Sequence, residues 1–173
     1  MHRDQVAYHV EHLQERDFHI TLSGHPKSEE LGTAGELVTA TRFIKSDRFL
    51  LHYGDILCNL DTGILRTEFF GAGTLAVSSQ CKLDKGVVEM QPDSDLIARI
   101  EEKPTIPKPN LMGIEVLNSL VLEHMNVGED VHRDVLPRLL EKGYKFKAYL
   151  TDLPYLDIGS VDSYRKAQDW VWK

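Results

Sequence analysis

Cysteine and long apolar runs are scarce in this sequence of 173 residues. Cys58 and Cys81 are the two cysteines, and their separation matches no metal-binding motif. We expect reduced thiols in a cytosol, with one disulfide between them as the alternative. No stretch approaches the about 18 apolar residues of a membrane span, and residues 1–17, "MHRDQVAYHVEHLQERD", contain no apolar signal region. The sequence therefore predicts a cytoplasmic protein with no membrane partner.

An excess of positive charge is also missing. The chain has 20 Lys and Arg against 27 Asp and Glu, which gives a formal charge of −7. Nonspecific nucleic-acid binding needs a basic face, so no nucleic-acid partner is expected. A few local cations are still enough to hold a small anionic ligand. Internal repeats, low-complexity runs and linkers are absent from the sequence, and we therefore predict a single domain over residues 1–173.

Strand-like and helix-like patterns alternate along the chain, which predicts an α/β fold. The segments with a strand-like pattern are 18–24, 48–57, 73–80, 111–118, 145–151 and 154–159. The segments with a helix-like pattern are 7–15, 34–46, 119–125, 130–142 and the residues that follow the N-cap Ser160. Residues 86–104 alternate around "PDSD", which predicts a hairpin. Residues 48–57 hold a continuous apolar run and then Gly-Asp, which is typical of a buried parallel strand that ends at a polar residue.

The stretch "LGTAG", residues 31–35, has two glycines around a Thr-Ala pair and precedes a helix-like pattern. A glycine-rich turn that opens a helix can bring backbone N–H groups up to a nucleotide. The alternative is a plain junction between a loop and a helix.

Two aspartates stand at the ends of predicted strands. Asp55 follows Gly54, and Asp157 lies in "YLDIG". Ligands of open α/β sheets bind at the carboxyl ends of the strands, and two converging carboxylates suit Mg²⁺, which commonly shares its oxygen ligands with phosphates. The alternative is that Asp55 is a turn residue and Asp157 caps a helix. Glu102 and Lys103 lie in "IEEKP". A solvated Glu–Lys pair with no binding role would give the same pattern.

Six motifs in order carry a family resemblance: "LGTAGEL", "YGDIL", "IEEKP", "MGIEVL", "DVLPRLLEKG" and "YLDIGSVDSYRKA". From about residue 10 to 169 the chain resembles the sugar-1-phosphate nucleotidylyltransferases, most of all the mannose-1-phosphate and heptose-1-phosphate guanylyltransferase branch. The resemblance implies a three-layer α/β/α sandwich with a Rossmann-like, mostly parallel sheet. It implies that a sugar 1-phosphate attacks the α-phosphorus of a nucleoside triphosphate, with GTP favoured, and that pyrophosphate leaves without a covalent intermediate.

The resemblance also implies roles for particular residues. The nucleotide would bind to Gly32, Thr33, Ala34 and Gly54. Asp55 and Asp157 would be the Mg²⁺ ligands and, with Lys103, the catalytic residues. Lys103 would contact a phosphate. The sugar would bind to Glu102, Gly113 and Asn110.

Asn110 departs from the family pattern by one position. The family often has Asn two residues before the glycine that is Gly113 here, and this chain has Leu111 there. Because a shift of one residue on a strand points a side chain to the other face, the sugar cannot be inferred from Asn110.

The family's glycine-rich loop, G-x-G-T/S-R, has no counterpart before residue 10, nor does the first strand–loop–helix–strand unit that carries it. Residues 71–75, "GAGTL", lack the arginine and lead into a strand. Three explanations remain open: a fragment completed by another chain, an oligomer that covers the open sheet, or a member that keeps the fold without the activity. We therefore expect either a nucleotidylyltransferase or a non-catalytic sugar-nucleotide-binding module, and an isolated chain that binds a sugar nucleotide weakly and is nearly inactive.

Overall fold

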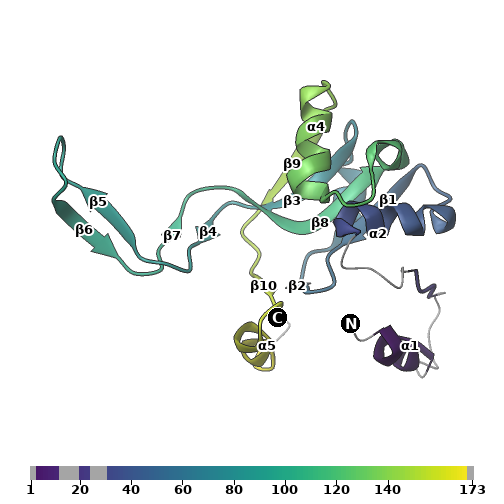
Figure 1. The fold of residues 1–173 in the computed structure, drawn as a ribbon, viewed down its shortest axis with the longest axis horizontal. Coiled ribbons are helices and arrows are strands. Elements are labelled where there is room, and N and C mark those ends of the chain that lie inside the picture. Colours follow the sequence, from purple (N-terminus) through teal and green to yellow (C-terminus); the bar gives the residue numbers. More distant parts are fainter. Residues whose placement is uncertain (1–2, 12–19, 24–30, 171–173) are drawn as a thin grey trace. The chain divides into compact units, whose positions relative to one another are not determined.

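The computed structural model describes residues 3–11, 20–23 and 31–170. The chain divides into two compact units. Figure 1 labels their helices and strands. The first unit takes Met1–Lys45 and Leu122–Leu139, and the second takes Ser46–Val121 and Leu140–Lys173. Within the described ranges, no helix has both the length and the apolar character that crossing a membrane requires.

The regular elements described in the first unit are helical. Its elements are α1 (Arg3–Glu11), α2 (Gly32–Ala40), the 3₁₀ turn η2 (Thr41–Phe43) and the π-helical turn η4 (Val131–Val135), which continues into α4 (Leu136–Glu141). The N-cap of η4 is Asp130, whose side chain accepts hydrogen bonds from the backbone N–H groups of His132 and Arg133. This cap satisfies donors that the start of a helical segment otherwise leaves open.

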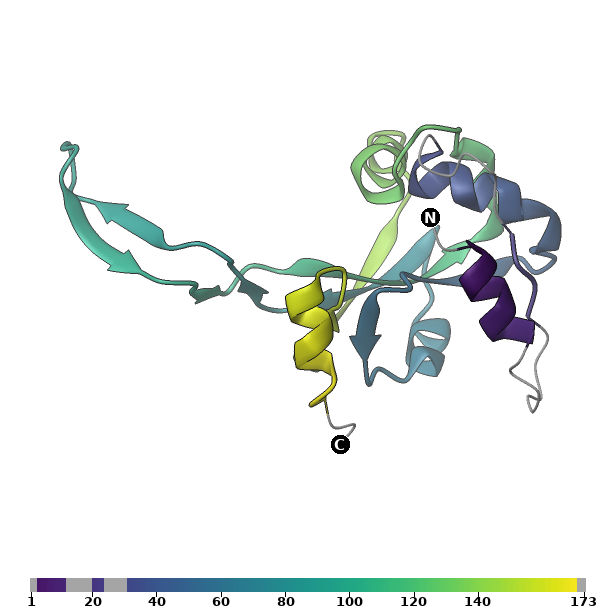
Figure 2. The ribbon, with the colours of Figure 1, turned by 60° about the horizontal axis from the view of Figure 1, so that its bottom comes forward.

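The second unit is built on a four-stranded sheet in the order β1-β8-β3-β9. Its strands are β1 (Arg48–His52), β8 (Asn110–Asn118), β3 (Gly73–Ser78) and β9 (Phe146–Thr151). β8 pairs antiparallel with β1 and with β3, whereas β3 and β9 are parallel, so the described part of the sheet is mixed. The short helix α3 (Thr62–Thr67) contacts β3 and β8 and lies on one side of the sheet (Figure 2).

Shorter elements complete the second unit. Three antiparallel strand pairs are β2 (Ile56–Cys58) with β10 (Tyr155–Asp157), β4 (Cys81–Lys82) with β7 (Thr105–Ile106), and β5 (Val87–Met90) with β6 (Ile97–Glu101). The other two elements are the turn η3 (Ser119–His124), whose last three residues are assigned to the first unit, and the helix α5 (Val161–Ala167). α5 begins at Ser160, which forms a capping box with Ser163. This reciprocal pair of hydrogen bonds satisfies two backbone donors at the start of the helix.

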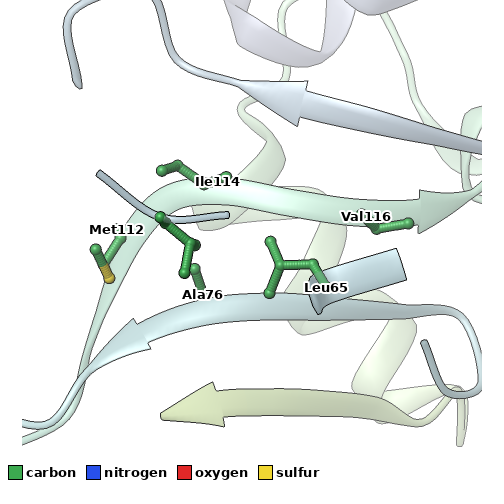
Figure 3. Close-up of a cluster of buried hydrophobic side chains, with 6 residues drawn as sticks. Leu65, Ala76, Met112, Ile114 and Val116 are labelled. Carbon is green, nitrogen blue, oxygen red and sulfur yellow. The ribbon is translucent and has the colours of Figure 1, made fainter. Parts of the chain in front are cut away.

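The core of the second unit lies between α3 and the sheet (Figure 3). Its buried members are Leu60, Leu65, Ala76, Met112, Ile114 and Val116. Burying one large aliphatic side chain such as Leu65 stabilises the fold by about 1.5–3 kcal/mol. Ile56 and Tyr155 pack against this cluster and thereby fix the β2–β10 pair to the sheet. Of the two aspartates of the predicted metal site, Asp55 directly precedes β2 and Asp157 is the last residue of β10.

Most of the predicted elements are confirmed. The hairpin in 86–104, the strands in 73–80, 111–118 and 145–151, and the helix N-cap at Ser160 all occur in the structure. Of the predicted helix 7–15, residues 7–11 belong to α1 and 12–15 lie outside the described residues. The strand predicted at 18–24 is absent from 20–23, and its remaining residues lie outside the described part.

The buried parallel strand predicted at 48–57 is wrong. β1 is a terminal strand of the sheet, runs antiparallel to β8 and ends at His52. Its apolar run is only half-buried, because Leu50 is 47% exposed on the face opposite Phe49 and Leu51. The chain then turns at 53–55 and starts β2. An edge strand with one covered face tolerates the same apolar letters as a buried central strand, so the pattern could not tell them apart.

Candidate active site

Asp55 and Asp157, 102 positions apart in the sequence, converge on Gly159. A Cβ atom built on Gly159 would lie 3.0 Å from Asp157 Oδ1 and 3.3 Å from Asp55 Oδ2. The pairing of Asp157 with Ile56 in the β2–β10 ladder brings the two segments together. The N–H of Ile158 donates to the carbonyl of Asp55 at 2.8 Å, and the N–H of Gly159 donates to Asp157 Oδ1 at 2.8 Å. The predicted convergence of the two carboxylates is present, although an antiparallel ladder produces it.

The carboxylate pair opens into a cavity of about 560 Å³ in the second unit. The residues that line it are Asp55, Gln80, Lys82, Asp84, Tyr155, Leu156, Asp157, Gly159 and Ser160. Burial raises the pKa of Tyr155, whose hydroxyl donates to the Asn110 side chain at 3.3 Å. Gln80 and Lys82 were missed by the sequence analysis, although they lie at and just after the end of the predicted strand 73–80, where ligand-binding residues of α/β proteins commonly occur.

The donor set fits a hard divalent cation. Mg²⁺ is usually held by one or two carboxylates and completes its octahedron with water and substrate phosphates. Asp55 and Asp157 supply two carboxylates around a space that a single methyl group would fill. In the described ranges there is no cluster of three or more His, Cys, Asp or Glu side chains that could enclose a metal by themselves.

Replacing Gly159 with alanine tests whether this space matters. The new methyl group would press on the ends of two side chains rather than on backbone, so the stability should change by less than about 1 kcal/mol. Divalent-cation affinity should fall about tenfold or more, because the two carboxylates must move apart. Calorimetric titration with Mg²⁺ measures the effect, with Gly54→Ala as control because a Cβ there has no atom within 4 Å. Unchanged Mg²⁺ affinity in Gly159→Ala would show that the space beside Gly159 does not take part in cation binding.

Glu102 and Lys103 follow β6 and precede β7. Both side chains are exposed, and neither lines the cavity. Lys103 has a φ of +48°, an uncommon left-handed conformation for a residue other than glycine. The carbonyl of Pro104 accepts the N–H of Leu83 at 3.0 Å. The Glu-Lys-Pro turn is thus tied to the segment whose Lys82 and Asp84 form one wall of the cavity.

Gly113 and Asn110 both lie on β8. Gly113 has a φ of +73°, and a Cβ there would lie 3.3 Å from atoms of Tyr53 and Ile56. The carbonyl of Gly113 accepts the N–H of Tyr53 at 2.9 Å. The absence of a side chain at Gly113 therefore lets the turn that carries Asp55 pack closely against β8. Asn110 does not line the cavity, but its side chain accepts a hydrogen bond from Tyr155, which does.

The glycine-rich turn 31–34 lies in the first unit, against the segment 128–131. The N–H of Ala34 donates to the carbonyl of Glu129 at 3.0 Å. Gly32 has a φ of +65°, and a Cβ there would lie 2.2 Å from the same carbonyl oxygen. Close approach of another stretch of backbone thus explains this glycine. The contact with a nucleotide remains a prediction.

The Thr33 hydroxyl is engaged within the protein. It donates to Asp130 Oδ2 at 2.8 Å and accepts the N–H of Val131 at 2.9 Å. A threonine hydroxyl has a single proton to donate, and Asp130 takes it. Thr33 can therefore offer a ligand only an acceptor lone pair, its methyl group and its backbone.

A salt bridge supports the segment 128–131. Arg138 donates from Nη1 and Nη2 to the two carboxylate oxygens of Glu129, at 2.6 and 2.7 Å, and Nη2 also reaches the carbonyl of His124. The hydrogen bonds from Arg138 lower the pKa of Glu129 from 4.5 to about 2. The bidentate geometry fixes the carboxylate more firmly than a single contact would.

This ion pair predicts a pH dependence of stability. The folded-state pKa of Glu129 lies below its ordinary value, so its contribution is fully present above about pH 4.5 and is lost as the pH falls towards 2. The difference in free energy of unfolding between the native chain and Glu129→Gln should therefore shrink over this range. Urea denaturation at pH 6, 4 and 2.5 measures it, with the exposed Glu123→Gln as control. A difference that does not change with pH would exclude the ionic contribution.

The comparisons with known proteins agree with this arrangement. The profile of the family described as "Nucleotidyl transferase" matches residues 1–172. A glucose-1-phosphate adenylyltransferase of Halalkalibacterium halodurans is 36% identical over 41% of this chain and 21% of its own length. A UTP–glucose-1-phosphate uridylyltransferase of Synechocystis is 28% identical over 95% of this chain and 50% of its own length. The chain thus spans between about a fifth and a half of these curated relatives.

Solved structures share the fold. HddC from Yersinia pseudotuberculosis has a TM-score of 0.70 at 20% identity, over 95% of this chain and 72% of that protein. The inositol-1-phosphate CTP transferase of T. maritima has a TM-score of 0.64 at 18% identity, over 94% of this chain and 68% of that protein. These likenesses confirm the predicted α/β fold class. Because the family profile covers nearly the whole chain, this protein belongs to the nucleotidyl transferase family.

Proposed function

We propose that this chain carries the sugar-phosphate and metal part of a sugar-1-phosphate nucleotidylyltransferase. The reaction would form an NDP-sugar and pyrophosphate from a nucleoside triphosphate and a sugar 1-phosphate. The observation that carries the proposal is the convergence of Asp55 and Asp157 on Gly159 in a polar cavity. Family membership and the sugar-1-phosphate transferases among the relatives support it.

The chemistry needs positioning more than covalent help. A non-bridging oxygen of the sugar 1-phosphate forms a bond to the α-phosphorus, and the bond from that phosphorus to the β-phosphate oxygen breaks, so pyrophosphate leaves. Asp55 and Asp157 would hold Mg²⁺, which supplies neutralising charge to the phosphates. Lys103 would add a cation at the phosphate, and Glu102 would accept hydrogen bonds from sugar hydroxyls. Alignment of the two substrates would contribute most of the acceleration.

The turn 31–34 would receive the base and ribose. In this turn Thr33 is exposed and its hydroxyl is bonded to Asp130, whereas Gly32 is half-buried and Ala34 is buried, with its N–H bonded to the carbonyl of Glu129. Gly54, in the exposed turn before Asp55, would lie beside the nucleotide phosphates. Gly113 and Asn110 would lie on the sugar side of the cavity.

The finer assignment favours GTP with mannose or heptose 1-phosphate. The order of the sequence motifs supports it, and a structural neighbour, HddC, has been solved in complex with GMP-PN. The adenylyl- and uridylyltransferases among the relatives make ATP and UTP the competing substrates to test. A cytoplasmic location stays a prediction, as does coverage of the open sheet by a second copy or a complementing chain.

The second candidate function is a non-catalytic module that binds sugar nucleotides. It is favoured by one observation, that residues 71–75, "GAGTL", lead into β3 rather than into a helix. Gly71 has a φ of +60°, and a Cβ there would lie 2.3 Å from the carbonyl oxygen of Lys145. Gly73 already belongs to β3. This glycine-rich stretch therefore starts a strand.

Two measurements at the same protein concentration separate the candidates. One is pyrophosphate release from GTP, ATP and UTP with mannose, heptose and glucose 1-phosphates in Mg²⁺. The other is calorimetric titration with GDP-mannose. Turnover that Asp55→Asn abolishes supports the transferase, whereas Mg²⁺-dependent binding with little turnover supports the module. Absence of both binding and turnover would overturn the two candidates together.

A further inference from the structure

The cavity at Asp55 and Asp157 has a basic side chain of its own. Lys82, the last residue of β4, lines it, and Lys103 does not. Among the lining residues, all of which belong to the described part of the chain, Lys82 is the single basic one. It stands with Gln80, whose side-chain amide can also donate to oxygen atoms. No sequence motif had indicated it.

The backbone that carries Lys82 is held from two directions. Lys82 pairs with Thr105 in the β4–β7 ladder, and the next residue, Leu83, donates its N–H to the carbonyl of Pro104 at 3.0 Å. On the other side, the Ser78 hydroxyl donates to the carbonyl of Gln80 at 2.9 Å. The short link between β3 and β4 is therefore fixed, and the lysine stem starts from a defined point on the cavity wall.

The ammonium group of Lys82 is available. Within the residues that the structure describes, it makes no ion pair, in contrast to Lys147, which binds Glu68. Asp55, Asp84 and Asp157 share the cavity with it, so the wall is net acidic. A phosphate group would be repelled there unless cations offset the carboxylates. A divalent ion at the aspartate pair can supply part of that charge, and a second cation is needed on the open side.

We propose that Lys82 binds a phosphate group of the ligand that occupies this cavity. The proposal rests on the function given above and adds a phosphate contact to the Asp55–Asp157 site. The phosphate would contact the ammonium group of Lys82 beside the aspartate pair, with the side-chain amide of Gln80 as a further donor. The sugar 1-phosphate and the nucleoside triphosphate offer this chemistry, and the triphosphate's leaving group, pyrophosphate, stands for it in the test. Two probes therefore represent the sources, the sugar 1-phosphate and pyrophosphate. The first is a substrate, and the second is a product.

The test uses the full chain, Mg²⁺ and two probes, pyrophosphate and mannose 1-phosphate, in calorimetric titrations. Lys82→Met should weaken binding of at least one probe about tenfold or more, because a charge-assisted hydrogen bond is lost. Lys82→Arg should restore most of the affinity. The matched control is Lys85→Met, an exposed lysine three positions away that does not line the cavity, and it should stay within about twofold. Thermal melting should be equal in all variants, since Lys82 is exposed.

The outcomes separate this proposal from the proposed function. If the native chain binds pyrophosphate but no sugar 1-phosphate, and Lys82→Met loses that binding, Lys82 is a phosphate ligand and the sugar-phosphate assignment fails. If both probes bind and Lys82→Met matches the native chain, Lys82 has no such role and the function stands. If neither probe binds in Mg²⁺, both proposals are overturned. Equal weakening by Lys82→Met and Lys85→Met would show a general charge effect and would also overturn the proposal.

Discussion

Asparagine at position 55 or 157 will weaken Mg²⁺ binding about tenfold or more while leaving the protein folded. Each variant removes one of two negative ligands and keeps the size of the side chain. Substitutions that only support a metal ligand already cost about 10–100-fold in affinity, so loss of the ligand itself should cost at least as much. In Asp157→Asn, the side-chain amide oxygen can still accept the N–H of Gly159, which donates to Asp157 Oδ1 at 2.8 Å in the native chain.

Metal-free stability gives a second readout. Two carboxylates that face the same small space repel each other when no cation lies between them. Either asparagine variant should therefore be as stable as the native chain, or slightly more stable, in buffer with a chelator. Added Mg²⁺ should raise the melting temperature of the native chain and raise that of the variants less. A purely structural role for the aspartates predicts the opposite, a loss of stability in both buffers.

Calorimetric titration with Mg²⁺ measures the affinities, with Asp95→Asn as control, because Asp95 is exposed in the hairpin turn far along the chain from the pair. If both aspartates hold the same ion, the double variant should be little worse than either single variant, since neither retains a complete site. Native affinity in both single variants would show that the pair does not bind the metal.

The sequence predicted that Asp55 and Asp157 lie close together, but it predicted the wrong strand arrangement as the cause. Asp55 and Asp157 were expected to meet because parallel strands deliver their ends to one edge of a sheet. In the structure they meet because β2 and β10 pair antiparallel, which places Asp157 opposite Ile56. The two carboxylates lie near each other as predicted, and their role stays a prediction, while strand direction depends on long-range pairing that periodicity does not contain.

Local chemistry was predictable where it acts within a few residues. The capping box at Ser160 and the hairpin around "PDSD" need only neighbours in the sequence, and both occur. Lys82 carried no such signal, because a lysine after a strand is ordinary on a surface. Its significance depends on the cavity formed with residues 155–160, some 75 positions away. Only the folded chain brings Lys82 close to residues 155–160, and amino-acid composition cannot indicate this proximity.

Gly32 shows how one pattern can serve two purposes. A glycine at the start of a helix was interpreted as room for a nucleotide. The structure places the carbonyl of Glu129 there, so the glycine is required for packing within the first unit. The two roles are compatible, since a turn that is fixed on one side can present its backbone on the other. Substitution can separate them.

Alanine at position 32 will destabilise the first unit strongly. Its Cβ would lie 2.2 Å from the carbonyl oxygen of Glu129, and its φ of +65° is left-handed. The conformation alone costs about 1–2 kcal/mol in a residue with a side chain. The clash forces backbone to move and adds about 1–3 kcal/mol. We expect a loss of about 2–5 kcal/mol, a large share of the stability of a small domain.

Alanine substitutions at three further glycines separate the cost of a left-handed backbone conformation from the cost of a steric clash. Gly71 has a φ of +60° and a Cβ there would lie 2.3 Å from the carbonyl oxygen of Lys145, so Gly71→Ala should match Gly32→Ala in size, in the second unit. Gly143 has a φ of +87° and open space around it, so Gly143→Ala should cost only the conformational part, about 1–2 kcal/mol. Gly54 has open space and no left-handed φ, so Gly54→Ala should lie within about 1 kcal/mol of the native chain.

Urea denaturation followed by circular dichroism ranks the four variants. Because the segment 128–131 carries the Arg138–Glu129 pair, its displacement in Gly32→Ala should also reduce the pH dependence that this pair creates. Nucleotide affinity, measured on whatever fraction of Gly32→Ala stays folded, then reports the second role. A variant that folds as well as the native chain and loses nucleotide binding would show that position 32 faces the ligand, and that the packing against Glu129 is not what selects glycine there. A destabilised variant that still binds nucleotide when folded would assign the glycine to packing alone.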